Sequence, residues 1–235
     1  MNKPHDLGGV KDKRPIPKST SYDEKVVLIA DSWTTRTLAI TLAIGFLRAW
    51  NLDTTRFYRE CLPPNDYRAS SYYKRWFLAL ERMIKDFELL SRSKKGSYAD
   101  EILKAKDIFD VLRKGGPTLR SKPETPNFLV GDIVKTKANY ENEFVKGGHS
   151  RLPRYAMGKK GKIVSHHNAH VFPDTNAHFK GEAPEHLYSI EFSSEELWGL
   201  TCENKHDSVT LDLWEPYLEK ADGQNGKRFF KIYVK

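Results

Sequence analysis

The first half of the chain places apolar residues at the three- and four-residue intervals that are typical of helices. This spacing predicts a first helix that begins at Asp31 or Ser32, either of which can cap it, and runs to Trp50. A second helix is predicted to begin near Thr54, whose hydroxyl can cap it, and to end before Pro63-Pro64. The N-terminal part of the chain is therefore predicted to be helical.

The same period continues in two further segments. A third helix is predicted after Ser70 or Ser71, with an apolar stripe made of Trp76, Leu80, Met83, Ile84, Phe87 and Leu90. A fourth is predicted to begin at Asp100 and to end at Gly115-Gly116. After it, GPTLRSKPETPN contains three prolines and no periodicity, which predicts a linker.

The second half of the chain alternates with period two. The runs NFLVGDIVKTK, GKKGKIVSHH, EHLYSIEF and DSVTLDLWEPYL each predict a strand, and Gly, Pro, Asn or Asp separate them. Several short strands of this kind indicate a small barrel, and the pair GDIV and GKKGKIV resembles SH3-like barrels. The predicted fold is α+β: a helical N-terminal domain (1–115, with an extended arm 1–30), a linker (116–127), an SH3-like β-barrel (128–219) and a C-terminal tail or edge strand (220–235).

Composition, the apolar runs and the cysteine content predict a folded protein of the cytoplasm. The chain has 235 residues with 30% charged and 12% aromatic side chains, enough for one large or two small folded domains. Its most apolar run, TLAITLAIGFL, is too short to span a bilayer, and no secretory signal is visible at the N-terminus. Cys61 and Cys202 stand far apart without a CxxC partner, which indicates a reducing compartment and disfavours a zinc ribbon.

The formal net charge of +8 raises nucleic-acid binding as a hypothesis, because Lys and Arg gain affinity by releasing counterions from phosphates. An acidic protein partner or a solvated basic surface explains the same excess. Net charge alone does not decide between these alternatives.

Four of the eight histidines fall in SHHNAHVFPDTNAH, which raises the question of a metal site. Zinc needs three or four ligands that converge on one point. On a strand, however, His166 and His167 point to opposite faces, and the PDTN turn is predicted to use Asp174 and Asn176 for hydrogen bonds to its own backbone. The sequence therefore predicts a hydrogen-bonded loop at this stretch, and no metal bound by this chain.

Common catalytic motifs are absent: the sequence has no GxSxG, no phosphate loop, no GxGxxG and no HExxH. Cys61 and Cys202 have no spaced histidine partner, so both are interpreted as passive thiols. Two arginines stand out instead, Arg56 in LDTTRFYRE and Arg151 in GGHSRLPRY. The simpler interpretation of each is a surface side chain stacked on an aromatic ring.

A series of motifs in order carries a family resemblance: HDLGG, DTTRFYRE, SSYYKRW, GHSRLPRYAMGKKGKI, HHNAHVFPDTNAH, HLYSIEFSSEELWG and DLWEPYL. Together they resemble the β subunit of nitrile hydratase from about residue 5 to residue 218. The resemblance implies an αβ heterodimer, or a doubled α2β2 assembly, that adds water to a small nitrile to give an amide. It also implies that a cobalt(III) or iron(III) ion is held by the α subunit through a cysteine cluster, two cysteines of which are oxidised to sulfinic and sulfenic acids.

The same resemblance implies roles for five residues. Arg56 and Arg151 match the arginines that reach the oxidised cysteine oxygens across the subunit interface. Tyr72 matches a position that lines the substrate pocket and can donate a hydrogen bond toward the active site, while Trp76 and Leu52 match apolar wall positions. Trp76 also fits the core stripe of its helix, so both interpretations stay open for it.

Departures from the family pattern leave alternatives to weigh. Relatives often carry histidine where this chain has Arg75 and arginine where it has Met157. Thiocyanate hydrolase is similar but divides the β-like part between two chains, which favours nitrile hydratase for an unbroken chain. A basic SH3-like nucleic-acid-binding protein would not explain ELWG, HDLGG or the helical half, and an accessory protein that inserts metal would resemble only one of the two halves.

Overall fold

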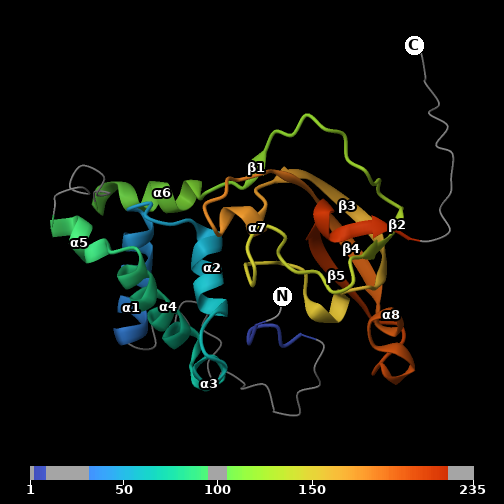
Figure 1. Ribbon diagram of the computed structural model, residues 1–235, viewed down its shortest axis with the longest axis horizontal. Coiled ribbons are helices and arrows are strands. Elements are labelled where there is room, and N and C mark those ends of the chain that lie inside the picture. The colour runs from blue at the N-terminus through green and yellow to red at the C-terminus, as the bar shows by residue number, and fades with distance from the viewer. Residues whose placement is uncertain (1–2, 9–31, 95–104, 222–235) are drawn as a thin grey trace. The chain divides into compact units, whose positions relative to one another are not determined.

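A computed structural model of the chain describes residues 3–8, 32–94 and 105–221 (Figure 1). The chain forms two compact units. The helical unit comprises residues 1–120 together with Glu141–Tyr155 and Val171–Pro184, and the sheet unit comprises Ser121–Tyr140, Ala156–His170 and Glu185–Lys235. Helices in the N-terminal region and an antiparallel sheet in the C-terminal region confirm the α+β class. The predicted domain boundaries stay a prediction.

The helices of the N-terminal region are α1 (Ser32–Gly45), α2 (Leu52–Glu60), α3 (Pro64–Ala69), α4 (Tyr72–Asp86), α5 (Leu89–Lys94) and α6 (Ile108–Lys114), the last preceded by a 3-10 turn at Ala105–Asp107. Helix α1 is shorter than predicted and ends at Gly45, with Arg48 in the left-handed region at φ 53°. The predicted cap Asp31 and residues 100–104 lie outside the described residues. Gly115 ends α6 as predicted, at φ 64°.

Three details of the second and third helices differ from the prediction. Helix α2 begins at Leu52 and its cap is Asn51, not Thr54, because the Asn51 side chain accepts the Thr54 N–H at 2.9 Å. Pro64 does not only stop a helix: it opens α3, since proline fits the first turn of a helix, where its missing N–H needs no partner. The predicted third helix is interrupted at Glu88, whose φ is 50°, before α5 begins.

A compact apolar cluster holds α4 against its neighbours. Its buried members are Trp50, Leu80, Met83 and Leu89. The members from α4 recur at the spacing of one helix face, which places them on the side that α1 and α2 contact. The apolar stripe predicted from the sequence is confirmed at Leu80, Met83, Ile84 and Phe87, which belong to this cluster. Its last member, Leu90, was wrongly assigned, because the helix is interrupted at Glu88 and Leu90 is 68% exposed on α5.

The strands of the sheet unit are β2 (Ile133–Thr136), β3 (Lys160–His170), β4 (Glu185–Ser193), β5 (Ser208–Trp214) and β6 (Leu218–Lys220). They pair antiparallel in the order β5-β4-β3-β2-β6. Four of them confirm the strands predicted from period-two alternation, while closure of the sheet into an SH3-like barrel stays a prediction. The shorter elements are β1 (Leu119–Arg120), α7 (Pro173–Asn176), α8 (Ser194–Trp198) and 3-10 turns at Arg154–Ala156, Gly199–Thr201 and Glu215–Tyr217. The tail beyond residue 221 lies outside the described residues.

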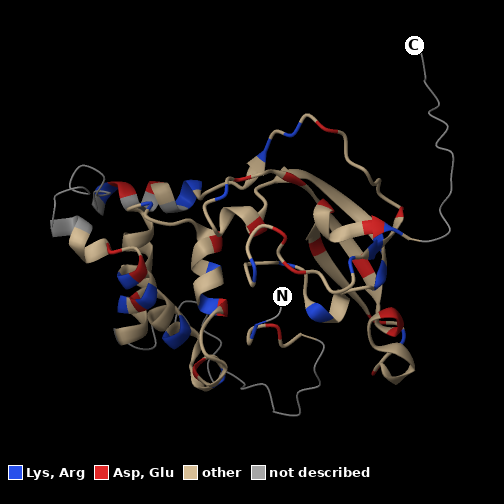
Figure 2. Cartoon of the chain, in the orientation of Figure 1, with Lys and Arg blue, Asp and Glu red and all other residues tan. Residues whose placement is uncertain are grey.

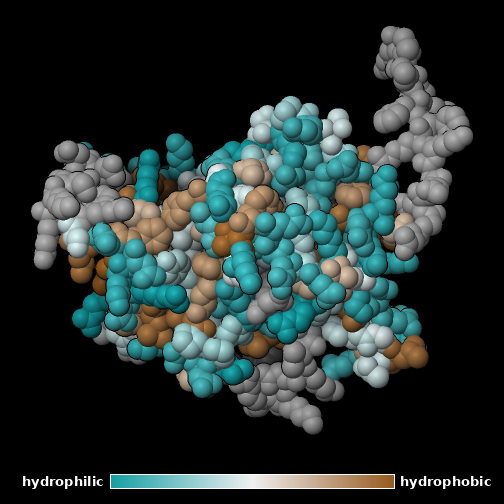
Figure 3. Space-filling view, in the orientation of Figure 1, coloured by the Kyte–Doolittle hydropathy of each residue, from teal (hydrophilic) through white to brown (hydrophobic). Residues whose placement is uncertain are grey.

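The helical unit exposes apolar surface between α1 and α4. A groove of ≈ 430 Å³ lies there, lined by Trp33, Arg36, Thr37, Ile40, Phe77, Leu80, Glu81 and Ile84. Figure 3 shows hydrophobic residues gathered over these two helices. No helix among the described residues is long and apolar enough to cross a membrane. Contiguous apolar surface on such a unit is typical of a protein-protein contact.

Charge is mixed on the same unit. Basic and acidic residues are interspersed along α2 and α4 (Figure 2). Neither helix presents a stripe of one sign, which is the electrostatic footprint that nucleic-acid binding requires. The positive charge of the chain therefore does not mark these helices as a nucleic-acid surface.

We expect Gly161→Ala to destabilise the sheet. Gly161 pairs with Val134, and a Cβ there would lie 2.6 Å from Ile190 Cγ2 and 3.0 Å from the Glu191 carbonyl oxygen. Because the neighbours are a buried side chain and backbone, the free energy of unfolding should fall by about 1–3 kcal/mol. Urea unfolding of the purified protein measures this. Gly116→Ala is the matched control, since a Cβ at Gly116 meets no atom within 4 Å; equal losses in the two variants would contradict the argument.

Candidate functional site

Helix α2, with the sequence LDTTRFYRE, carries two of the predicted site residues, and its first turn is held by the segment around α7. Asn51 donates from Nδ2 to the Asn176 carbonyl oxygen at 2.6 Å, and the Thr54 hydroxyl donates to the Ala177 carbonyl oxygen at 3.0 Å. The Asn176 side chain donates to Asp53 Oδ2 at 2.8 Å, so the prediction that it would bond its own backbone was wrong. These bonds fix where α2 begins.

Arg56 is oriented by the same contacts. Its Nη1 donates to Asp53 Oδ1 at 2.9 Å, while the other oxygen of that buried carboxylate is taken by Asn176. The Arg56 side chain is 40% exposed. A guanidinium has five N–H donors, so a fixed carboxylate on one side leaves donors of Arg56 available to a second anion.

Glu60, at the last residue of α2, is the centre of a buried polar network. Its Oε2 accepts a hydrogen bond from His149 Nδ1 at 2.8 Å, and its Oε1 lies 3.6 Å from His5 Nε2 and 3.7 Å from Arg151 Nη1. Burial alone would raise the pKa of Glu60, but the hydrogen bond from His149 and the positive charges around the carboxyl outweigh it and lower that pKa. Glu60 is therefore a buried carboxylate whose charge is compensated from two other segments of the chain.

The segment that carries His149 and Arg151 is folded around one buried amide, that of Asn142. Its Nδ2 donates to the His149 carbonyl oxygen at 2.6 Å, and its Oδ1 accepts from the N–H groups of Phe144 and Val145 at 2.8 Å. Gly148 is required here, because a Cβ would lie 2.7 Å from the Val145 carbonyl oxygen. The turn brings Arg151, which is 37% exposed, to the end of α2.

Tyr72 and Trp76 form an aromatic surface on α4. Their ring centroids lie 5.5 Å apart, and Tyr72 is 62% exposed. Trp76 is partly buried, and the guanidinium of Arg59 lies over its indole, 4.3 Å from the centroid. Trp76 therefore belongs to this aromatic surface, and it is not among the residues that pack in the apolar cluster of α4. Leu52 is exposed at the first residue of α2, one turn before Arg56.

Helix α2 thus connects the predicted site residues. Arg56 lies on it, Glu60 holds Arg151 at its end, and Arg59 holds Trp76 on α4. The sequence analysis did not assign roles to Glu60, His149 or Arg59. The sequence spacing could have indicated Glu60 and His149, because Glu60 follows Arg56 by about one helical turn and His149 precedes Arg151 by two residues.

The histidine-rich stretch separates into different environments. His166 Nε2 lies 3.2 Å from His186 Nδ1, whereas His167 Nε2 lies 2.7 Å from Ser189 Oγ, which confirms that the two rings leave β3 on opposite faces. His178 belongs to the helical unit and accepts the His149 N–H. Within residues 3–8, 32–94 and 105–221, no group of three or more His, Cys, Asp or Glu is placed to hold a metal ion.

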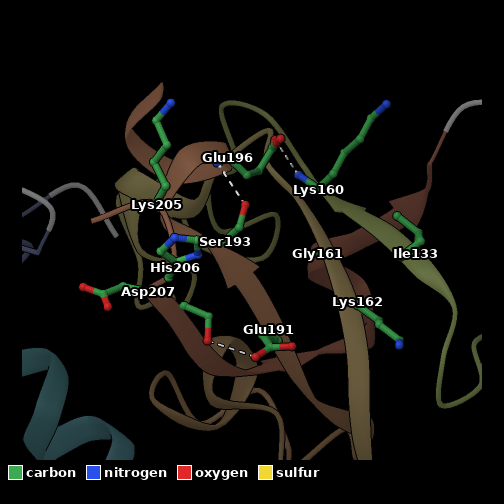
Figure 4. A pocket seen from close by; sticks show the side chains of 11 residues that line it. Ile133, Lys160, Gly161, Lys162, Glu191, Ser193, Glu196, Lys205, His206 and Asp207 are labelled. Atoms are coloured by element: carbon green, nitrogen blue, oxygen red, sulfur yellow. Dashed lines mark hydrogen bonds between the residues drawn. The ribbon is translucent and has the colours of Figure 1, made fainter. Parts of the chain in front are cut away.

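The sheet unit has an open polar hollow of ≈ 490 Å³, lined by Ile133, Lys160, Gly161, Lys162, Glu191, Ser193, Glu196, Lys205, His206, Asp207 and Ser208. Figure 4 shows the ammonium ends of Lys160, Lys162 and Lys205 pointing away from one another, so they do not converge on one anion. Glu196 accepts the Lys160 N–H, and Glu191 accepts the Ser208 hydroxyl. None of the predicted site residues lines this hollow.

Comparisons with known proteins match both halves of the chain. Residues 1–107 match the family model "Nitrile hydratase beta subunit, N-terminal", and residues 117–220 match "Nitrile hydratase beta subunit, C-terminal". The low-molecular weight cobalt-containing nitrile hydratase subunit beta of Rhodococcus rhodochrous is 34% identical, over 92% of this chain and 98% of the relative. The cobalt-containing nitrile hydratase subunit beta of Pseudonocardia thermophila is 31% identical, over 94% and 97%. A solved structure of thiocyanate hydrolase from Thiobacillus thioparus, the recombinant apo-enzyme, is 30% identical over 41% of this chain and 78% of that chain, with a TM-score of 0.37.

We expect acid to loosen the segment that carries Arg151, through His178. His178 Nε2 accepts the His149 N–H at 2.9 Å, and burial together with the nearby positive charges of His149, Lys3 and Lys180 lowers the pKa of His178. The unfolded chain therefore binds this proton first, near the ordinary value of about 6.5. The stability that the neutral ring contributes is complete above that pH and is lost as the pH falls toward the lower folded value.

Urea unfolding of the purified protein between about pH 7.5 and pH 5 measures this slope. His178→Gln keeps an acceptor but does not titrate, so its stability should fall less steeply than that of the wild type. His206→Gln, at an exposed position, is the control and should follow the wild type. A slope in His178→Gln that equals the wild-type slope would exclude His178 as the group responsible.

Proposed function

The chain belongs to the nitrile hydratase β-subunit family, and from that premise we propose that Arg56 and Arg151 complete the active site by holding oxidised cysteine oxygens of the α subunit. The chain is a subunit of a hydro-lyase that hydrates a nitrile to the corresponding amide. The observation that carries the proposal is the Glu60 network, which places Arg151 at the end of the helix that bears Arg56.

The metal belongs to the partner in this proposal. A cobalt(III) or iron(III) ion is held by a cysteine cluster of the α subunit, and the names of two relatives favour cobalt. When bound there, the ion supplies Lewis-acid activation of the nitrile or of the nucleophile. The donor chemistry of the described residues fits this division, because they offer charged hydrogen-bond donors at the site and no cluster of three metal ligands.

Guanidinium groups suit the partner's oxidised cysteines. Sulfinate and sulfenate are small anions, and arginine offers a planar fork of donors that stays charged when it is buried. Arg56 forms an ion pair with Asp53, and Arg151 forms one with Glu60, so a carboxylate orients each arginine side chain. About two fifths of each arginine side chain stays exposed and can contact a partner. Each arginine can therefore address a different cysteine and keep the oxidised thiolates in shape.

The substrate-binding surface of this chain consists of Tyr72, Trp76 and Leu52 in the proposal. The exposed Tyr72 ring presents a hydroxyl that can donate toward the partner's active-site sulfur or a water molecule. The Trp76 indole gives one wall for the organic group of the nitrile, and Leu52 at the start of α2 gives another.

Assembly follows from the same family. As a β subunit the chain pairs with an α subunit, and we infer an αβ heterodimer, or its doubled α2β2 form, in the cytoplasm. The apolar groove between α1 and α4 supports a large partner contact, since obligate interfaces bury apolar surface. The SH3-like closure of the sheet belongs to the same proposal and is supported by the antiparallel order β5-β4-β3-β2-β6.

We expect Arg56→Lys and Arg151→Lys each to nearly abolish nitrile hydration while the fold stays intact. Lysine keeps the charge but loses the planar fork, so it cannot bond its own carboxylate and a second anion at once. An anion left partly unpaired costs about 1–3 kcal/mol or more, which corresponds to a decrease in kcat/KM of at least about 5- to 150-fold. Turnover by the assembled complex is measured beside its metal content and circular dichroism.

The matched control is Arg154→Lys, an exposed arginine three residues after Arg151. It should retain the wild-type turnover. Wild-type turnover in Arg56→Lys or Arg151→Lys at full metal loading would contradict the role proposed for that arginine. It would favour the simpler interpretation of a surface residue beside an aromatic ring.

We also expect the isolated chain to bind no stoichiometric transition metal despite its histidines. The rings of His166 and His167 leave β3 on opposite faces, so they cannot share an ion. Elemental analysis of the chain and of the αβ complex, after dialysis against the same metal-free buffer, measures this. A tightly bound ion on the isolated chain that His166→Ala and His170→Ala remove would overturn the assignment of the metal to the partner.

A further inference from the structure

Arg59 differs from the two arginines of the proposed site in how its charge is compensated. Arg56 pairs with Asp53 and Arg151 with Glu60. Arg59 is partly buried, yet no carboxylate among the described residues lies within ion-pair distance of it. Its contacts are the Thr55 carbonyl oxygen, which accepts from Nε at 3.1 Å, and the face of the Trp76 indole. A partly buried cation without a counter-ion is a position at which an anionic ligand gains affinity.

The Arg59 side chain is held in place. The contact with the Trp76 ring, 4.3 Å from Cζ to the ring centroid, and the bond from Nε to the carbonyl one turn earlier restrict the position and direction of the guanidinium. Burial lowers the pKa of Arg59, with Tyr72, Glu60 and Tyr67 opposing that change. An arginine stays protonated under these conditions, so the charge that burial disfavours persists and can be met by a ligand.

Position connects this charge to the proposed substrate surface. The ring that Arg59 covers is Trp76, which lies 5.5 Å from the exposed Tyr72 ring. One face of the Trp76 indole is therefore occupied by a cation and is not available as a purely apolar wall. A ligand that lies along Tyr72 and Trp76 meets a fixed guanidinium at the edge of that surface.

We propose that Arg59 is a specificity-determining residue that receives an anionic group of the substrate, so that nitriles bearing a carboxylate are a preferred class. The proposal rests on the proposed function, because it assumes that Tyr72 and Trp76 line the substrate pocket. The terminal nitrogens of a guanidinium match the two oxygens of a carboxylate in one plane. Stacking on Trp76 orders that plane before the substrate arrives, which lowers the entropy lost on binding.

The test compares two nitriles of similar shape on the assembled αβ complex. The probes are 3-cyanopropanoate and 4-methylpentanenitrile, in which an isopropyl group replaces the carboxylate. The measured quantity is the ratio of their kcat/KM values near pH 7 in the wild type and in Arg59→Leu. We expect this ratio to fall about 10- to 100-fold in Arg59→Leu, chiefly through a higher KM for the anionic nitrile. Arg59→Lys, which keeps the charge without the plane, should give an intermediate ratio.

The matched control is Arg82→Leu on α4, an exposed arginine near the Tyr58 ring that pairs with Asp86. Its ratio should equal that of the wild type. An unchanged ratio in Arg59→Leu overturns the proposal. An equal loss of activity toward both nitriles, with less α subunit in the purified complex, also overturns it and assigns Arg59 to a carboxylate of the partner. If the wild-type complex hydrates the neutral nitrile, the proposed function is supported independently of the result for Arg59→Leu. If the wild-type complex hydrates neither nitrile, the proposed function fails, and the role of Arg59 in substrate specificity fails with it.

Discussion

The carboxylate of Glu60 is the constraint on which the proposed site depends. A buried charge is costly unless hydrogen bonds and positive charge compensate it, and Glu60 has a hydrogen bond from His149, with His5 and Arg151 close to its other oxygen. These residues come from three segments of the helical unit that are far apart in sequence. Compensation of one charge therefore brings the N-terminal segment, the end of α2 and the segment of Arg151 to the same point. The direction of Arg151 is a consequence of where Glu60 is buried.

Arg56, Arg59 and Arg151 lie on or beside α2, and they are fixed in two different ways. Two of them carry their own carboxylate, which offsets most of the cost of partial burial and still leaves donors for a small anion. Arg59 is fixed by an aromatic face and a backbone carbonyl, neither of which neutralises it. The same residue type thus gives two donors that are oriented by carboxylates, which we propose bind groups of the partner, and one cation that lacks a carboxylate among the described residues.

Local patterns predicted the elements, but they did not predict what joins them. The apolar stripe of α4 and the alternation in β3 and β4 gave the right element types, because each reflects burial of one face. Asn51 was missed as a cap because Thr54, three residues later, has an equally suitable side chain. Glu60 and His149 are 89 residues apart in the sequence, so the spacing of apolar residues within one helix or strand cannot predict their hydrogen bond. Arg56 and Arg151 were found by motif, whereas Arg59 became visible only through its contact with Trp76.

The histidines show why closeness in sequence was a poor guide to chemistry. His166 meets His186 on β4, His167 meets Ser189 on the other face of the sheet, and His178 serves the backbone of His149 in the helical unit. Each ring is used as a local hydrogen-bonding group, which leaves the described part of the chain with preoriented cations rather than metal ligands. Cations of this kind have no reaction of their own, because they need an anion or a polarised group to act on. As a member of the nitrile hydratase β-subunit family the chain has an α-subunit partner, and in our proposal that partner brings the metal and the oxidised ligands on which these cations act.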